Sequence, residues 1–359
     1  MLRLPFLGLE ATLNFKFRKS SIDLYRKLGE FVDMEKTLLT ISIVHFNTAE
    51  MTKRCIESIF NVLDSGPLSG LYEISIVDNR SDILEYENLS YFVESIGREN
   101  VFLQRSCMNT GFGLGCMLTL NRSARENIAF VNSDTFFDED CFTPLIKFLK
   151  GHPKAAAITP QHKDGGGNPT RSFSRFDSFG SRFIGSWVSC PFIADKKNSN
   201  NLKGNVTTVD FIFGSFMMVK RDAFAIVGGF DPSIFLYYEE MDLCLRLKKC
   251  GFSTHFYPNA SFCHIGNGSS SGVTEVLRLE SLLSMIYVMR KHRGAVYGLA
   301  FYLALVFQSA LKAPFKSRNR RIFIGVLKAF MPQACSHRLT QSCNFEITSS
   351  GEPPRSATS

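Results

Sequence analysis

The sequence predicts an α/β protein built on a mostly parallel central sheet that is covered by helices on both faces. Two observations support this fold class. From residue 37 onward, short apolar runs rich in β-branched residues alternate with longer segments that have helical spacing. The connections between these segments are short, which is typical of strands joined by crossover helices.

The first strand is expected over residues 37–46 (TLLTISIVHF), which are apolar and β-branched. A helix over residues 49–63 follows, because apolar residues recur there at helical spacing. The alternation continues with strands over 71–78, 100–105, 127–132 and 155–160. Helices are expected over 83–97, over a separate segment that follows the Gly-rich turn and ends at Leu120, and over 140–150.

Residues 161–205 interrupt this alternation with a stretch rich in Gly, Ser, Phe and Asn, in which arginines stand among aromatic residues. A structureless loop of this length usually carries a function or is disordered. Regular structure is expected to resume over 207–231 as a strand pair and a short helix. A helix over 243–249 and a strand over 253–258 then follow.

The charge distribution divides the chain. The net charge is +8, but residues 281–345 hold ten Lys or Arg and no Asp or Glu, so the remainder sums to −2. We expect a leader over 1–36, the main α/β domain over 37–272, a basic helical segment over 273–331 and a disordered tail over 332–359. Because the main domain is not basic, no nucleic-acid partner is expected.

Residues 294–311 form an uncharged run of 18 residues, which is at the lower limit for a membrane span. Basic clusters flank the run on both sides. Three interpretations stay open: a helix that lies in the cytoplasmic membrane interface, a buried helix that packs on the main domain or in a dimer, and a true span. The flanking charge favours the interface.

The ten cysteines show no C-x-x-C spacing, and several lie in apolar runs, which favours reduced thiols in a cytosolic protein. No secretory signal is evident, because the first apolar run ends early at Lys16 and Arg18. We therefore expect a cytoplasmic protein that is peripheral at the inner face of the cell membrane.

Polar side chains stand at the ends of three predicted strands. They are Asn47, then Asp78 and Asn79, and then the NSD run over residues 132–134. Any one of them alone is a routine turn or helix cap. Because ligands bind at the carboxyl ends of parallel strands, the three together predict a nucleotide pocket.

The stretch NTGFGLG over residues 109–115 has the spacing G-x-G-x-G, which is not the dinucleotide fingerprint G-x-G-x-x-G. It also follows the third strand instead of opening the first βαβ unit. A glycine turn that lets the backbone approach a ligand closely remains open for this stretch.

The stretch FLYYEEMDLC over residues 235–244 places Glu239, Glu240 and Asp242 within four residues, beside apolar neighbours. Like charges this close resist ionising together, so the cluster is unusual at the edge of a hydrophobic segment. Asp242 is expected to cap or brace the following helix, whose N-terminal dipole favours a carboxylate.

Seven short motifs occur in a fixed order along the chain: VHFN, VDNRS, NTGFGLG, NSD, VGGFD, FLYYEEMDLCLRL and YPNASFCH. Over residues 38–271 the set resembles the inverting GT-A glycosyltransferases of family 2, especially the bacterial rhamnosyltransferase-like branch. The resemblance implies a GT-A, Rossmann-like fold and a hexosyltransferase activity. A sugar such as rhamnose would move, with inversion, from a nucleoside-diphosphate sugar to a growing cell-surface polysaccharide. The implied acceptor is a polyprenyl-diphosphate-linked saccharide, and the membrane surface is therefore an implied partner.

The resemblance also implies roles for individual residues. Asn47 and Asp78 match the positions that hold the base and ribose of the donor. Four further residues belong to the same donor-binding motifs, namely Asn79, Asn109, Gly111 and Asn132. Asp134 and His264 match the ligands of a Mg²⁺ or Mn²⁺ ion, which would neutralise the diphosphate.

Glu240 matches the general base that removes the proton of the acceptor hydroxyl. The usual pair in the family is Glu-Asp, whereas this chain has Glu239 and Glu240. The extra methylene requires the acceptor to lie slightly farther away, and Glu239 is the alternative base. Asn132 replaces the first acid of the usual metal motif, which leaves fewer anionic ligands.

Two other functions remain open. A catalytically silent, sugar-nucleotide-binding scaffold of a polysaccharide assembly complex is consistent with the Glu-for-Asp exchange. Retention of Asp134, Glu240 and His264 opposes it. A nucleotidyltransferase would need a Gly- and Arg/Lys-rich phosphate loop after the first strand, where this chain has VHFNTAEMTKR.

Overall fold

The computed structural model describes residues 38–122, 125–184, 204–266, 274–315 and 317–328. All of them belong to the unit Leu38–Ser359 into which the chain divides after Thr37. The expected leader over 1–36 and the expected disordered tail over 332–359 lie outside the described residues.

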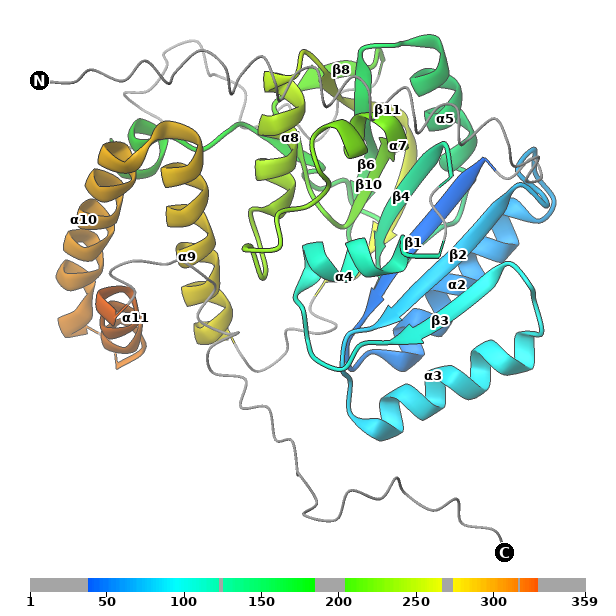
Figure 1. Ribbon diagram of the computed structural model, residues 1–359, viewed down its shortest axis with the longest axis horizontal. Coiled ribbons are helices and arrows are strands. Elements are labelled where there is room, and N and C mark those ends of the chain that lie inside the picture. Colours follow the sequence, from blue (N-terminus) through cyan, green and yellow to red (C-terminus); the bar gives the residue numbers. More distant parts are fainter. Residues whose placement is uncertain (1–37, 123–124, 185–203, 267–273, 316, 329–359) are drawn as a thin grey trace, which may run out of the picture. The chain divides into compact units, whose positions relative to one another are not determined.

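The central sheet of nine strands has the order β3-β2-β1-β4-β10-β6-β11-β5, and β8 pairs with β11 (Figure 1). The strands are β1 (Leu39–His45), β2 (Tyr72–Asp78), β3 (Val101–Arg105), β4 (Asn127–Asn132), β5 (Thr135–Phe136), β6 (Ala155–Lys163), β8 (Thr207–Val209), β10 (Phe216–Lys220) and β11 (Ser253–His264). The first four strands are parallel, as expected. β10 is antiparallel to both of its neighbours, β4 and β6.

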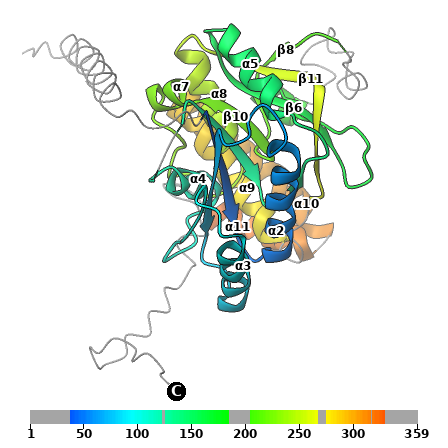
Figure 2. The ribbon, with the colours of Figure 1, turned by 90° about the vertical axis from the view of Figure 1, so that its right-hand side faces the viewer.

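Helices cover both faces of this sheet. They are α2 (Ala49–Leu63), α3 (Ile83–Ile96), α4 (Phe112–Thr119), α5 (Phe142–Gly151), α7 (Arg221–Ile226) and α8 (Glu239–Lys249). Residues of α2, α3 and α5 share one core cluster with Ala129 and Val131 of β4. Residues of α4, α7 and α8 share the second with Ile128 and Phe130, since successive strand residues point to opposite faces. Figure 2 shows α2 and α4 on opposite sides of the strands.

Three elements near the expected site have different bounds from those that the sequence predicts. α8 begins at Glu239 and not at residue 243, so all three clustered carboxylates lie in its first turn. β11 continues to His264 instead of ending at Pro258, because an irregularity between Tyr257 and Ser261 takes the proline out of the ladder. β6 likewise extends to Lys163, three residues into the predicted loop.

The rest of the region predicted as a long loop is only partly described. β7 (Phe173–Ser174) pairs with β9 (Phe211–Ile212), and a π-helix, η1 (Gly180–Ile184), follows β7. The described cysteines are all free, which agrees with the expected reduced thiols.

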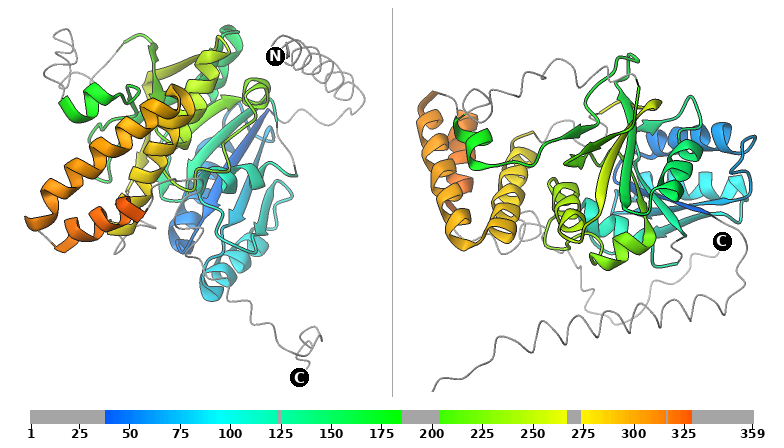
Figure 3. Two further views of the ribbon diagram at one scale, coloured as in Figure 1. Left: turned by 60° about the vertical axis from the view of Figure 1, so that its left-hand side comes forward. Right: turned by 90° about the horizontal axis from the view of Figure 1, so that it is seen from above.

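The C-terminal segment is helical, as expected. It consists of α9 (Thr274–Arg293), α10 (Ala295–Lys312), the 3₁₀ turn η2 (Ala313–Phe315) and α11 (Ser317–Lys328), which lie side by side (Figure 3). A third core cluster joins these helices to Ile234 and to Met241 of α8. Among the described residues, one stretch, Ala295–Phe315, is long and apolar enough to cross a membrane by length and composition, and only 22% of its most apolar 18 residues are buried.

Candidate active site

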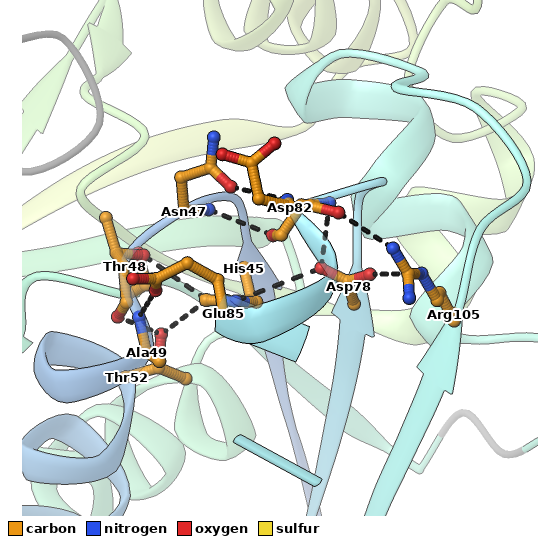
Figure 4. Close-up of polar contacts among 11 residues, drawn as sticks. His45, Asn47, Thr48, Ala49, Thr52, Asp78, Asp82, Glu85 and Arg105 are labelled. Carbon is orange, nitrogen blue, oxygen red and sulfur yellow. Dashed lines mark hydrogen bonds and ion pairs between the residues drawn. The ribbon is translucent and has the colours of Figure 1, made fainter. Parts of the chain in front are cut away.

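The loops after β1 and β2 are tied to each other by hydrogen bonds (Figure 4). Asn47 has a left-handed backbone (φ 52°), and its amide N–H donates to Ser81 Oγ at 2.9 Å. Its side-chain Oδ1 accepts from the backbone N–H of Asp82 at 2.8 Å. Glu85 accepts from the N–H of Ala49, which satisfies one free donor at the start of α2. The exposed Asn47 amide is therefore held at the rim of the sheet.

Asp78 is completely buried at the end of β2. One carboxylate oxygen accepts from the backbone N–H of Ser81 at 3.1 Å and lies 3.8 Å from His45 Nε2. The other forms an ion pair with Arg105 Nε at 3.1 Å. Burial lowers the pKa of His45, so this ring is neutral near pH 7 and Arg105 balances the Asp78 charge. Arg105, at the end of β3, was not predicted from the sequence.

Asn79 fixes the glycine turn that precedes α4. Its Nδ2 donates to Asn109 Oδ1 at 3.0 Å and to the Gly111 carbonyl at 2.9 Å. Its Oδ1 accepts from both the N–H and the hydroxyl of Thr110. This set uses both donors and both acceptor sites of the amide, so Asn79 acts here by positioning the turn.

The glycine turn approaches another part of the chain very closely. Gly111 has φ +79°, and a Cβ placed on it would overlap the carbonyl of Phe235. The same carbonyl accepts from the N–H of Phe112 at 2.9 Å. A Cβ on Gly113 would lie 3.5 Å from Glu239 Cβ. The close approach that the glycines allow is thus to the acidic segment, and it brings the NTGFGLG and FLYYEE motifs together.

Asp134 and His264 lie next to each other, with Asp134 Oδ1 3.0 Å from His264 Nε2. They meet because β5, which begins directly after Asp134, pairs with the end of β11. Asn132 Nδ2 lies 3.3 Å from the same imidazole nitrogen. An oxygen and a nitrogen donor at this spacing fit one divalent ion of the Mg²⁺ or Mn²⁺ class, with Mn²⁺ the better match for imidazole.

The protein supplies few ligands at this point. In the ranges that the structure covers, no group of three His, Cys, Asp or Glu side chains is arranged to hold a metal ion. Asp134 and His264 therefore suit an ion that takes its other ligands from a bound phosphate and water. His162, which the sequence analysis placed in a loop, also lies here: its ring centroid is 5.2 Å from that of His264.

Glu239 and Glu240 have different environments. Glu239 is 2% exposed, and burial followed by the nearby Glu240 charge raises its pKa well above the usual range. Glu240 is half-buried, and its Oε1 accepts from the backbone N–H of Gly214 at 2.8 Å. Burial raises the pKa of Glu240 too, while the Gly214 hydrogen bond acts in the opposite direction. Of the two, Glu239 is the more strongly buried and its charged form is the more disfavoured, whereas Glu240 keeps a backbone donor that favours its carboxylate.

The loop that holds Glu240 also contacts the Asp134 side of the site. Ser215 follows Gly214, and its carbonyl accepts from the N–H of Asn132 at 3.1 Å and from Thr135 Oγ1 at 3.2 Å. Glu240 is therefore connected to the Asp134 and His264 pair through two adjacent residues of one loop. Gly214 is a further residue that the sequence analysis missed, although a glycine inside a strand pattern is a known signal of close backbone approach.

Two consecutive tyrosines precede these carboxylates in an unusual conformation. Tyr237 and Tyr238 have φ values of 66° and 69°. Left-handed backbone at two non-glycine residues is strained and persists only where the surroundings hold it in place. The Tyr238 hydroxyl donates to Asp177 at 2.8 Å, which supplies part of that support.

Asp242 is a structural carboxylate. It is fully buried, and it accepts from Arg246 Nε and from His292 Nε2, each at 2.8 Å. Lys291 Nζ forms an ion pair with it at 2.6 Å. Burial alone would raise its pKa, but the His292 hydrogen bond, Arg246 and Lys291 outweigh it and hold the pKa at about 2. Asp242 thus braces α8 through Arg246, as expected. It also ties α8 to α9 through Lys291 and His292.

We expect Asp242→Asn to destabilise the fold by about 3–5 kcal/mol, because Arg246 and Lys291 lose a buried partner. The folded-state pKa lies below the ordinary value of 3.8, so the carboxylate stabilises the protein above pH 3.8 and this contribution is lost as the pH falls toward 2. Urea unfolding at pH 7 and near pH 2.5 measures both effects. Asp222→Asn in an exposed pair is the control, and equal losses in the two variants would contradict the role of Asp242.

Comparison with known proteins identifies the family. A family model described as Glycosyl transferase family 2 matches residues 40–227, just over half of the chain. The chain belongs to glycosyltransferase family 2. The family-2 match begins in β1 and includes every strand end described above up to β10, so the motif-based assignment is confirmed.

Two relatives of this family-2 chain are rhamnosyltransferases by name. Rhamnosyltransferase WbbL of Escherichia coli (strain K12) is 36% identical over 86 residues, which are 24% of this chain and 33% of that protein. The N-acetylglucosaminyl-diphospho-decaprenol L-rhamnosyltransferase of Mycobacterium tuberculosis is 28% identical over 142 residues, which are 38% of this chain and 46% of that protein. The family-2 chain therefore spans less than half the length of these two relatives.

One solved structure is similar over most of the family-2 chain. The mannosyltransferase PcManGT from Pyrobaculum calidifontis, in complex with GDP-Man and Mn²⁺, gives a TM-score of 0.52 at 12% identity and covers 83% of this chain and 88% of that one. At this identity the likeness concerns the fold alone. It confirms the GT-A α/β architecture that the sequence predicts.

Proposed function

We propose that this chain transfers a sugar from a nucleoside-diphosphate donor to a lipid-linked or growing cell-surface saccharide, with inversion at the anomeric carbon. The observation that carries the proposal is the connection of Glu240, through Gly214 and Ser215, to the strand ends that bear Asp134 and His264. A basic carboxylate beside a pair of metal-type ligands is the arrangement that this reaction needs.

Donor binding is assigned to the rim formed by β1, β2 and the glycine turn. We assign contacts with the base and ribose to Asn47 and to Asp78, the latter shared with Arg105. Asn79, Asn109 and Gly111 hold the turn in place. Asn132 lies at the end of β4, between this rim and His264.

The diphosphate is assigned to the Asp134 and His264 side of the site. A Mg²⁺ or Mn²⁺ ion held by these two residues would neutralise the charge that develops on the leaving diphosphate. PcManGT, which shares the fold, was solved with Mn²⁺, and this supports a divalent ion here as well.

The proton transfer is assigned to Glu240. As the acceptor hydroxyl bonds to the anomeric carbon, its proton passes to the Glu240 carboxylate and the bond from carbon to the diphosphate oxygen breaks. Attack from the side opposite the diphosphate gives inversion. Glu239 remains the alternative base, but its burial raises its pKa and disfavours the charged carboxylate that a general base needs.

A lipid-linked acceptor and peripheral attachment to the cytoplasmic face of the membrane complete the proposal. One relative, by its name, acts on a diphospho-decaprenol-linked sugar. One face of α10 is buried against its neighbours, while the other exposes large apolar residues: Val296, Leu299, Leu303, Phe307 and Leu311. They recur at intervals of three or four residues and so form one stripe, which favours the interface interpretation over a fully buried helix.

The test is a donor screen on the full chain with Mn²⁺, using dTDP-, UDP- and GDP-sugars, with dTDP-rhamnose first. A ligand that binds only the folded state raises the melting temperature, so the donor that fits should be identified directly. Release of nucleoside diphosphate on addition of a polyprenyl-diphosphate saccharide then tests transfer. Binding without release would support the silent scaffold instead, and no shift with any donor would refute both.

The pH dependence of kcat/KM should reflect Glu240. Its raised pKa means that the active carboxylate is present only at a higher pH than for an ordinary Glu of pKa 4.5. Activity should be retained above this raised pKa and lost as the pH falls through it. Rates measured at saturating metal between pH 4 and 8 check the prediction, and an acid limb centred at or below pH 4.5 would contradict it.

Gly214→Ala should reduce transfer by about 100-fold, because a Cβ there would overlap Glu240 Oε1 and displace the base. The double variant Gly214→Ala with Glu240→Asp shortens the acid and should recover part of the rate. Gly165→Ala is the matched control, since its new methyl meets only Ile265, at 3.9 Å. Comparable rates for the Gly214 and Gly165 variants would count against the position assigned to Glu240.

A further inference from the structure

A second pocket lies among the C-terminal helices and is distinct from the residues assigned above. Three cationic side chains line it: Arg182 of η1, Arg278 of α9 and Lys312 of α10. All three are exposed. Among the side chains that the structure describes, no carboxylate forms an ion pair with any of the three. Arg321 of α11, by contrast, forms an ion pair with Glu275 at 2.6 Å.

The remaining lining suits an anion that carries an apolar group. Gln308 and Asn319 contribute amides, and Asn319 is fixed by donating to the Lys312 carbonyl at 2.9 Å. Leu282, Leu305 and Ile322 line the same pocket and are buried. Three exposed cations and two amides above apolar side chains match a phosphate with a hydrocarbon neighbour, and they do not match a neutral sugar.

The exposed apolar stripe of α10, which starts at Val296, ends near this pocket. Phe307 directly precedes Gln308 and is 67% exposed, and Leu311 directly precedes Lys312 and is 58% exposed. Phe315, in η2, is 80% exposed. Large apolar side chains next to exposed cations are typical of a helix that lies in the interface of an anionic membrane.

We propose that this pocket binds the phosphate group of a membrane lipid while the apolar stripe of α10 enters the surrounding acyl region. The inference rests on the proposed function only in assuming that the chain works at a membrane. It adds a specific lipid-phosphate site, formed by Arg182, Arg278 and Lys312, to the general surface contact.

The pocket is connected to the acidic segment by η1. Phe179 N–H donates to Tyr297 of α10 at 2.7 Å, and Phe183 packs on Phe301 with ring centroids 5.1 Å apart. Burial and Asp177 raise the pKa of Tyr238, whereas Arg182 acts in the opposite direction, so Arg182 lies within electrostatic range of the residue that precedes Glu239.

The test is flotation of the full chain with three kinds of vesicle: phosphatidylcholine alone, phosphatidylcholine with phosphatidylglycerol, and phosphatidylcholine with a polyprenyl phosphate. The variant is Arg278→Gln with Lys312→Gln, and the control is Lys147→Gln with Lys150→Gln, which removes two exposed charges from α5. Each basic residue near an anionic surface contributes about 5-fold in affinity, so the pocket variant should bind both anionic vesicles about 30-fold more weakly than wild type. The control should bind like wild type.

Equal weakening in the two variants, or none in either, would overturn the proposal. Melting temperatures with inorganic phosphate, at constant ionic strength, distinguish a soluble phosphate from a lipid phosphate as the occupant of the pocket. If phosphate raises the melting temperature of wild type but not of the pocket variant, while neither protein floats with vesicles, the site takes a soluble anion and the lipid assignment is wrong. The donor-induced melting shift is measured in parallel. If no donor raises the melting temperature, while the pocket variant still binds anionic vesicles more weakly than the control, the transfer function is refuted and the pocket assignment stands.

Discussion

Glu240→Gln is expected to lower the rate of sugar transfer by about 10²–10⁴-fold, the usual contribution of a general base. The amide keeps the size of the side chain and an oxygen that can accept from Gly214 N–H, but it cannot take the acceptor proton. Donor binding should therefore stay close to that of wild type. Initial rates with the donor identified by the screen, together with the donor-induced melting shift, measure the two effects separately.

Glu239→Gln is the matched control for this experiment. Glu239 is buried with a raised pKa, so a neutral amide resembles its protonated form and should cost much less activity. If Glu239→Gln abolishes transfer and Glu240→Gln does not, Glu239 is the base. Wild-type rates in both variants would refute carboxylate base catalysis at this site.

Asp134→Ala and His264→Ala should each weaken Mn²⁺-dependent donor binding by at least about 100-fold, since even indirect partners of a metal ligand are worth 10–100-fold. The two side chains are 3.0 Å apart and supply different donor atoms, so losing either leaves one protein ligand of the pair. Donor titrations with and without Mn²⁺ measure the effect as a change in the metal-dependent part of the affinity.

His152→Ala is the control for these ligand variants, because His152 lies at the C-terminal end of α5 and is exposed. Its donor affinity and metal dependence should equal those of wild type. Metal dependence that survives unchanged in Asp134→Ala and His264→Ala would show that the ion, if the reaction uses one, is bound by other groups.

The sequence predicted the first half of the fold closely because the necessary information there is local. α2 and β4 have the expected bounds, since a strand or helix with a clear apolar period depends little on distant residues. The start of α8 was missed for the opposite reason. Its preceding residues, Tyr237 and Tyr238, adopt left-handed backbone without a glycine to signal it.

The candidate site could be predicted only in part from the sequence, for a similar reason. The strand-end rule placed Asn47, Asp78 and Asp134 at one edge of the sheet, and the motif order added Glu240 and His264. The contacts that define their environments come from residues far away in sequence. Gly214 sets the position of Glu240, and Lys291 and His292 determine the charge state of Asp242. Pairings over such distances have no local sequence pattern.

The most direct measurement is a crystal structure of the full chain with Mn²⁺ and the nucleoside diphosphate whose sugar form gives the largest melting shift. The nucleoside should lie against Asn47 and the loop after β2, the ion should contact both Asp134 and His264, and the Glu240 carboxylate should face the open end of the diphosphate. A nucleotide bound elsewhere, or bound here with Glu240 directed away from the diphosphate, would contradict sugar transfer at this site.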